Sequence, residues 1–157
     1  MVMVEDNFYT DAPALVLRST NDFHDRNLLV IDQLVKLVEE KNGKVKFPLL
    51  ITGFDVKAKS DDGYGIKIVP RDDFQAVFDE RLSGKYDCKR FSGVDELGLP
   101  KFEYNGKRKW HAKGMGVSGF YLGSYLGLYS MDEDLALSSG EGRIVLVRDG
   151  NLEGMLR

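Results

Sequence analysis

Cysteine is nearly absent from this sequence, and histidine is scarce. The 157 residues include one cysteine, Cys88, and two histidines. A single cysteine excludes an intramolecular disulfide, and it predicts that no cysteine-based zinc site forms. The core must therefore hold together without covalent cross-links.

Long apolar runs and a surplus of positive charge are also missing. No stretch is apolar over the roughly 20 residues that a membrane-spanning helix needs, and residues 1–7 lack the basic and apolar regions of a signal peptide. We therefore expect no membrane insertion, and either a cytosolic location or delivery by a carrier such as a virion. The formal net charge of −3 argues against nucleic acid as the main partner, because phosphate binding relies on excess Lys and Arg.

The remaining composition is that of a folded protein. Hydrophobic residues make up 43% of the chain and charged residues 30%, which is ordinary for a globular domain. The length fits a single domain over residues 1–157.

Hydrophobic periodicity predicts a mixture of helices and strands. Residues 13–19 suit a strand, and a helix is expected from about residues 22–26 to a left-handed cap at Asn42-Gly43. Its inward face would hold Leu28, Ile31, Leu34, Val35 and Val38.

The middle of the chain predicts a hairpin followed by a second helix. Alternation over residues 54–58 favours a strand, which residues 64–70 would pair after a turn. Residues 71–84 suit a helix, residues 85–99 an irregular loop, and Asn105-Gly106 a tight hairpin turn. A buried strand is expected at residues 144–147, so the fold class is α+β with small mixed or antiparallel sheets.

Few side chains suit catalysis or metal binding by their pattern alone. His24 lies among helix-capping residues, which favours a structural role, whereas His111 follows Trp110 and is a candidate for a binding surface. The letters of "GMGVSG", residues 114–119, match a dinucleotide fingerprint but lack the strand before and the helix after that phosphate binding needs.

Acidic residues raise two further alternatives. Asp55, Asp61 and Asp62 with nearby lysines could serve a metal-dependent nuclease or hydrolase, although alternating polar residues on a half-buried strand already explain the pattern. Residues 132–134 place three carboxylates together, which leaves calcium as an open cofactor, while a solvated acidic turn is the simpler interpretation.

The sharpest pattern is the row of tyrosines in "SGFYLGSYLGLYS", residues 118–130. On one strand, Phe120 and the leucines would point into the core, and the tyrosines and glycines would point outward. A hairpin turning at Gly123-Ser124 is the alternative. Tyrosine with glycine and serine is typical of binding loops, because tyrosine supplies amphipathic contact area at low entropic cost.

Residues 110–147 resemble the C-terminal region of variable proteins from diversity-generating retroelements. The resemblance is carried by "GVSGFYLGSYLGLYS" and "DLALSSGEGRIVLV". It implies a C-type-lectin fold in which two helices flank the sheets and the terminal strands, here residues 13–19 and 143–149, pair. In that family a reverse transcriptase misreads template adenines, so that codons of the AAC type become codons for other residues.

The resemblance implies a set of variable, ligand-binding positions and no need for catalysis. A protein or glycan on a host or other cell would be the ligand. Met131, Glu133 and Glu141 depart from the codon pattern. A structural or assembly subunit, with tyrosines buried between copies, is the remaining alternative. The implied ligand-binding residues are Tyr121, Gly123, Ser124, Tyr125, Gly127, Tyr129, Asp132, Leu137 and Ser139.

Overall fold

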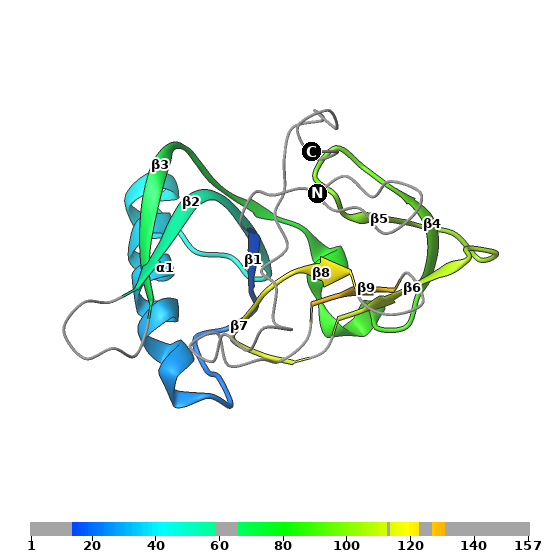
Figure 1. Ribbon diagram of the computed structural model, residues 1–157, viewed down its shortest axis with the longest axis horizontal. Helices are drawn as coiled ribbons and strands as arrows, with labels where there is room; N and C mark the ends of the chain where they lie inside the picture. The colour runs from blue at the N-terminus through cyan, green and yellow to red at the C-terminus, as the bar shows by residue number, and fades with distance from the viewer. Residues whose placement is uncertain (1–13, 59–65, 113, 123–126, 131–157) are drawn as a thin grey trace.

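A computed structural model of the protein describes residues 14–58, 66–112, 114–122 and 127–130 (Figure 1). Within these ranges the chain forms one α-helix, two short 3-10 helices and nine strands. In chain order they are β1 (Ala14–Leu17), α1 (Asp25–Asn42), β2 (Leu49–Ala58), β3 (Ile66–Phe78), η1 (Glu80–Leu82), η2 (Gly84–Tyr86), β4 (Arg90–Val94), β5 (Pro100–Phe102), β6 (Arg108–His111), β7 (Val117–Ser118), β8 (Tyr121–Leu122) and β9 (Leu128–Tyr129).

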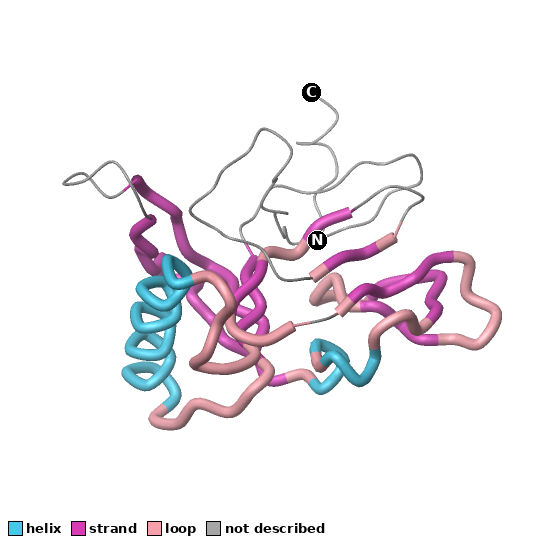
Figure 2. Tube along the Cα trace, turned by 90° about the horizontal axis from the view of Figure 1, so that it is seen from below, coloured by secondary structure: helices cyan, strands magenta, loops and turns pink. Residues whose placement is uncertain are grey.

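The strands form two sheets, which confirms the α+β class. One sheet has the order β3-β2-β1-β7 and is antiparallel throughout. The other has the order β5-β4-β6-β9-β8 and is mixed, because β6 and β9 run parallel. In Figure 2, α1 lies on one side of the sheet β3-β2-β1-β7, and β4 to β6 lie on the other side of that sheet.

Strand β1 lies between helix α1 on one face and the second sheet on the other, so that α1 and the two sheets form three layers. All four of its side chains are buried, and their alternation divides them between two cores. Leu15 and Leu17 pack with the buried face of α1, whereas Ala14 and Val16 pack with the core toward the second sheet. The short apolar run is therefore explained by a strand that is covered on both faces.

Helix α1 forms as its sequence predicts. Gly43 ends it in the left-handed conformation, with φ 77°, and donates its N–H to the Glu39 carbonyl. The predicted inward face is correct for Ile31, Leu34 and Val38, but Leu28 is exposed and Val30 is buried in its place. The helix is rotated slightly from the expected face.

The second predicted helix, residues 71–84, is wrong. Strand β3 continues to Phe78 and pairs with β2 along its length, and only the 3-10 turns η1 and η2 follow. The apolar residues fit both periods, because Phe74, Ala76 and Phe78 also recur at every second position. These three pack in the core beneath α1, so pairing with β2 overrode the local helical pattern.

Two further local predictions fail in the second sheet. Residues 85–99 contain strand β4, and β4 lies between β5 and β6, so Asn105-Gly106 does not join two paired strands. A Cβ atom on Gly106 would lie 2.4 Å from the backbone nitrogen of Phe91. The glycine therefore permits close passage over β4.

Arg18 links the layers immediately after β1. Its guanidinium donates to the Leu82 carbonyl, to the Ser118 hydroxyl and to both the carbonyl and the hydroxyl of Ser130, at 2.8–2.9 Å. Ser118 and Ser130 are buried and hydrogen-bonded to each other at 2.9 Å. One side chain thus fixes η1, β7 and the end of β9 together.

Strand β1, the first strand of the predicted terminal pair, has a neighbour on each side. β1 pairs with β2 on one side and, at Val16 and Leu17, with β7 on the other. Residues 143–149, its predicted partner, lie outside the described residues. The part of the chain that the structure describes is thus a three-layer α+β arrangement with one α-helix.

Candidate functional site

The predicted ligand-binding residues fall mostly outside the described ranges. Backbone positions are described for Tyr121, Gly127 and Tyr129. Gly127 is buried, whereas an outward position was expected for it. The others lie outside the described residues: Gly123, Ser124, Tyr125, Asp132, Leu137 and Ser139.

Tyr121 and Tyr129 are brought together by strand pairing. β8 and β9 are antiparallel, with Tyr121 opposite Tyr129 and Leu122 opposite Leu128. The single long strand considered for residues 120–129 is therefore wrong. A hairpin forms, as in the alternative, but the pairing of Leu122 with Leu128 does not centre its turn on Gly123-Ser124 as expected. This hairpin forms one edge of the five-stranded sheet.

Both ends of the hairpin are attached to the core. Phe120, just before β8, is fully buried as predicted and packs against Trp110, with ring centroids 5.6 Å apart. Ser130, just after β9, donates its N–H to the carbonyl oxygen of His111 at 2.7 Å. The tyrosine-bearing strands are thus held on a rigid frame.

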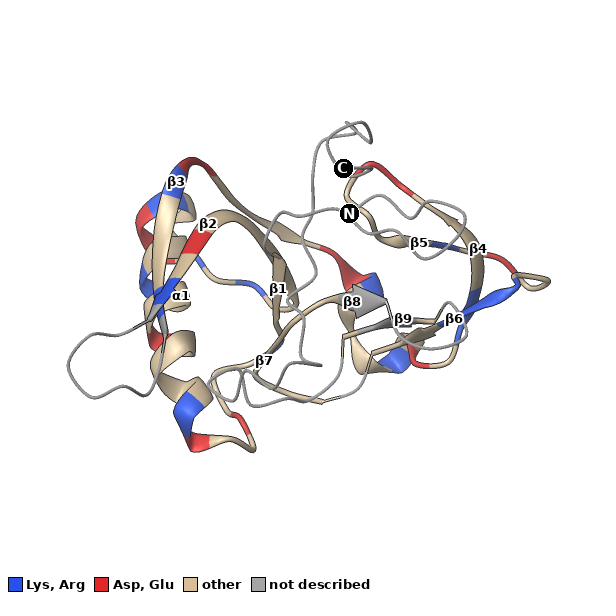
Figure 3. Ribbon diagram, in the orientation of Figure 1, with Lys and Arg blue, Asp and Glu red and all other residues tan. Residues whose placement is uncertain are grey.

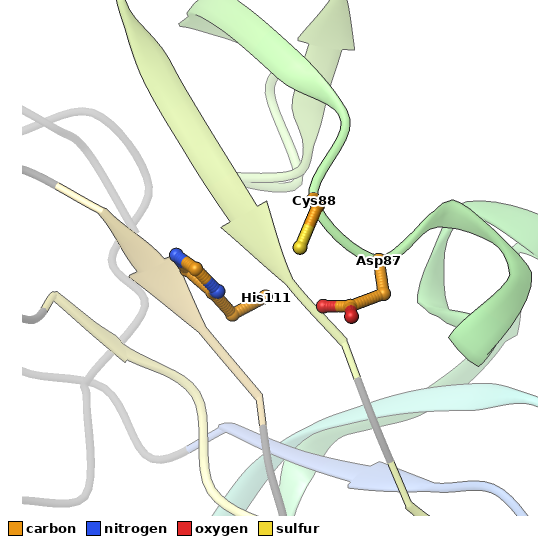
Figure 4. Close-up of side chains that lie close together, drawn as sticks. All are labelled: Asp87, Cys88 and His111. Atoms are coloured by element: carbon orange, nitrogen blue, oxygen red, sulfur yellow. The ribbon is translucent and has the colours of Figure 1, made fainter.

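A second feature lies next to this hairpin. Asp87 and Cys88 occupy the turn after η2, and His111 ends strand β6 (Figure 4). One potential ligand atom from each side chain lies within 4.8 Å of the other two. Cys88 is exposed, and Asp87 and His111 are half-buried.

Hydrogen bonds on either side of His111 hold this cluster in place. The Cys88 N–H donates to the Trp110 carbonyl at 2.7 Å. The Ala112 N–H donates to Oδ1 of Asp87 at 3.2 Å. Because the turn is attached both before and after His111, the Asp87 carboxylate and the backbone of Cys88 keep their places relative to the end of β6.

Cys88 has an unusual backbone conformation. Its φ of 66° is the one positive φ at a non-glycine residue in the described part of the chain. For a residue with a Cβ, this left-handed conformation costs roughly 1–2 kcal/mol. Such a residue is a reason to look for function at the position.

An open cleft adjoins the cluster. Its volume is about 740 Å³, and Cys88 lines it together with Lys89, Arg90, Phe102, Glu103 and Tyr104. Tyr86 stacks on Phe102 with ring centroids 5.5 Å apart, and the Lys89 ammonium lies over both rings. Polar and aromatic groups thus surround the exposed side of the thiol.

Positive charge gathers on the same sheet. Figure 3 shows basic residues along β6 and the turn before it, where Lys107, Arg108 and Lys109 lie. Lys109 is the cross-strand neighbour of Arg90 on β4. Lys107 and Lys109 are exposed.

The other sequence candidates are dispersed. Asp55 is exposed and forms an ion pair with Arg71 at 3.5 Å, while Asp61 and Asp62 lie outside the described residues. His24 is the N-cap residue of α1. The acidic residues 132–134, with Met131 and Glu141, also lie outside the described ranges.

The glycines of residues 114–119 serve the fold. Gly116 has φ 72°, and a Cβ there would lie 2.1 Å from Oδ2 of Asp22. Strands β7 and β8 follow it. The segment therefore does not lead into a helix, whose N-terminus a dinucleotide site would need.

Sequence reasoning missed the Asp87, Cys88 and His111 cluster. Cys88 and His111 are 23 positions apart, and Asp87 and Cys88 lie in the segment expected to be an irregular loop. The available signal was chemical: the sole cysteine, next to an aspartate, in a chain with two histidines. The pairing of β4 with β6 and the hydrogen bonds beside His111 bring the two parts together.

No protein-family model matches this chain, and no significant match was found among curated proteins or solved structures. Among the described residues, no helix has the length and apolarity that crossing a membrane would require.

Proposed function

We propose that the protein is a ligand-binding protein whose recognition surface lies in its C-terminal third, within residues 110–147. The observation that carries this proposal is the β8–β9 hairpin, which places Tyr121 opposite Tyr129 at the edge of the second sheet. Its connecting residues, 123–127, are Gly, Ser, Tyr, Leu and Gly. Tyrosine, serine and glycine are the residues that binding loops favour.

The attachment of the hairpin supports the same proposal. Recognition loops gain affinity when a rigid scaffold limits the entropy lost on binding. Phe120 and Trp110 provide a packed base, and the bond from Ser130 to His111 fixes the far end. Exchange of residues between these anchors would change the surface while leaving the base intact.

The proposed class is that of variable proteins from diversity-generating retroelements, with a C-type-lectin fold. This part of the proposal rests on the resemblance over residues 110–147. The fold gives it no further support, because the second flanking helix that the family implies is strand β3 here. The proposed ligand is a protein or glycan on a host or other cell. Its contacts would come from a few aromatic anchors, foremost Tyr121, Tyr125 and Tyr129.

The two alternatives receive less support. A nuclease would use Asp55, whose described partner is Arg71. An assembly subunit would bury the tyrosines between copies, which predicts a stable oligomer and tyrosines protected from chemical modification. No contact in the described part of the chain favours either alternative.

A genomic observation tests the retroelement origin. We expect a near-copy of the DNA that encodes residues 110–147, lying beside a reverse transcriptase gene. Differences between the two copies should fall at adenines of the template. The absence of such a copy in the source genome would remove this origin while leaving ligand binding open.

A binding experiment tests the surface itself. The triple variant Tyr121→Ala, Tyr125→Ala, Tyr129→Ala should lose binding on an array of glycans and host surface proteins, with its melting temperature retained. Tyr104→Ala is the matched control, because Tyr104 is 94% exposed and lies outside the proposed surface. An unfolded triple variant would instead identify the tyrosines as core residues and contradict the proposal.

A further inference from the structure

Asp87, Cys88 and His111 offer three different ligand types at one point of the fold. A thiol, an imidazole and a carboxylate lie with their ligand atoms within 4.8 Å of one another. We infer that this cluster binds one divalent transition-metal ion of the zinc class, with a fourth coordination position open to water or a ligand atom. The inference is independent of the tyrosine surface, and it departs from the expectation that a chain with one cysteine forms no cysteine-based zinc site.

The spacing is close to what a metal needs. Zinc takes sulfur at about 2.3 Å and nitrogen or oxygen at about 2.0–2.2 Å, so tetrahedral ligands lie about 3.3–3.8 Å apart. The observed limit of 4.8 Å exceeds this range by about 1.0–1.5 Å. Side-chain rotation at an exposed cysteine and a half-buried histidine closes such a gap without moving the backbone.

The chemistry of the donors selects the ion. Thiolate and imidazole favour zinc and its neighbours, whereas calcium and magnesium require oxygen ligands, and Asp87 alone supplies these. When bound, the Cys88 thiolate and the Asp87 carboxylate carry two negative charges together. A divalent ion balances both, so the loaded site would be neutral.

A catalytic thiol relay fits the geometry less well. In such a relay the sulfur and the carboxylate oxygen bond to opposite ring nitrogens, which places them about 7 Å apart. Here a carboxylate oxygen lies within 4.8 Å of the sulfur, and both lie within that distance of one ring nitrogen. The three ligand atoms thus form a triangle instead of a line through the ring.

The surrounding bonds arrange the ligands in advance. Oδ1 of Asp87 accepts from the Ala112 N–H, in the manner of the hydrogen bonds that orient metal-binding carboxylates. The Cys88 N–H is fixed to the Trp110 carbonyl. The fold therefore orders the Asp87 carboxylate and the backbone of Cys88 before an ion arrives.

The fourth coordination position of the ion would lie near the cleft and strand β9. Cys88 lines the cleft with Phe102 and Tyr104, and His111 is the cross-strand neighbour of Tyr129 on β9. With three protein ligands, the ion keeps the vacant position that structural zinc sites lack. A small ligand with a nitrogen, oxygen or sulfur donor is the class of molecule that this position would take.

Titration of the metal-free full chain with Co²⁺ tests the inference. We expect one equivalent to bind, with a thiolate-to-cobalt charge-transfer band and the intense visible bands of a four-coordinate ion. Zn²⁺ should displace Co²⁺ and abolish these bands, whereas Ca²⁺ should not. Failure to bind one equivalent, or binding without the thiolate band, would overturn the inference.

Three variants identify the ligands while preserving the fold. Cys88→Gly removes the thiol and suits the left-handed backbone, and Asp87→Asn retains the acceptor for Ala112. With His111→Asn, each should weaken Co²⁺ binding at least about tenfold, since even loss of a group that only orients a ligand costs 10–100-fold.

His24→Asn is the matched control for the histidine, because it replaces the other imidazole of the chain. Its Co²⁺ affinity should equal that of the wild type. If the Asp87 and His111 variants also bind Co²⁺ as tightly as the wild type, the ion is held elsewhere or by the thiol alone, and the inference fails.

Discussion

Cys88 donates its backbone N–H to the carbonyl oxygen of Trp110 at 2.7 Å, so the turn that carries the thiol is fixed to the strand that carries His111. This bond joins two segments that are 22 residues apart in the sequence. It also holds Cys88 at φ 66°, a conformation that glycine adopts without cost. The position therefore retains a side chain against the preference of its own backbone.

Cys88→Gly should stabilise the protein in the absence of metal. Relief of the left-handed conformation is worth about 1 kcal/mol in the free energy of unfolding, after the greater flexibility of glycine in the unfolded chain is subtracted. Urea unfolding measures it. Cys88→Ala keeps the Cβ and should remain near the wild type, so equal stability of the two variants would contradict this account.

Arg18→Met should destabilise the protein by about 2–3 kcal/mol, because it removes charged hydrogen bonds from partners with little access to water. The guanidinium bonds to Leu82, Ser118 and Ser130 would all be lost. Chemical unfolding is the measurement.

Arg71→Met is the matched control for Arg18. Arg71 makes ion pairs with Asp55 and Asp73, and all three side chains are substantially exposed. Its loss should cost no more than about 1 kcal/mol, as is usual for surface pairs. A cost for Arg18→Met as small as this would show that the layers are held together without its hydrogen bonds.

Acid should weaken the fold partly through Asp79. Arg81 donates to both carboxylate oxygens at 2.9 and 2.6 Å, which holds the pKa of Asp79 below its ordinary value. The unfolded chain then binds the proton more readily. The stabilisation is complete above the unfolded pKa of about 3.9 and is lost as the pH falls through the lower pKa of the folded state.

Asp79→Asn should therefore reduce the loss of stability in acid. The variant retains the oxygen that accepts from the Arg81 N–H but cannot titrate. Unfolding free energies compared from about pH 6 down to about pH 3 give the test. Asp72→Asn removes the same charge from an exposed position on β3 and controls for net charge. Parallel curves for wild type and Asp79→Asn would refute the role of this pair.

The sequence predicted those elements whose local signals agree with their tertiary setting. Helix α1 has its apolar stripe and its cap at Gly43, and the hairpin of β2 and β3 has its alternation. The helix predicted for residues 71–84 is wrong because the spacing of Phe74 and Phe78 fits a helix and a strand alike. Pairing with β2, a non-local interaction, decided between them.

The two candidate sites differ in how far the sequence could reveal them. The tyrosine hairpin is local, so its composition was visible, although only strand pairing settled that it turns back on itself. The cluster of Asp87, Cys88 and His111 is not local. It depends on β6 lying beside β4, an arrangement that the Asn105-Gly106 signal contradicted.

Gly106→Ala should be strongly destabilising, because the added Cβ atom would overlap the backbone of Phe91. A Cβ at this position would lie 2.4–2.6 Å from three backbone atoms of Phe91, so the chain must move away from β4. Overpacking of this kind costs about 1–3 kcal/mol or more. The movement would also disturb the pairing of β6, and with it the position of His111.

Gly93→Ala provides the matched control, because a Cβ there meets nothing within 4 Å. Its φ lies outside the left-handed region, so the added methyl group should leave stability within about 0.5 kcal/mol or raise it slightly by restricting the unfolded chain. Thermal and urea unfolding of both variants decide the matter. Equal effects at the two glycines would show that Gly106 serves as a flexible turn residue, whereas a loss confined to Gly106→Ala assigns it to the close passage over Phe91.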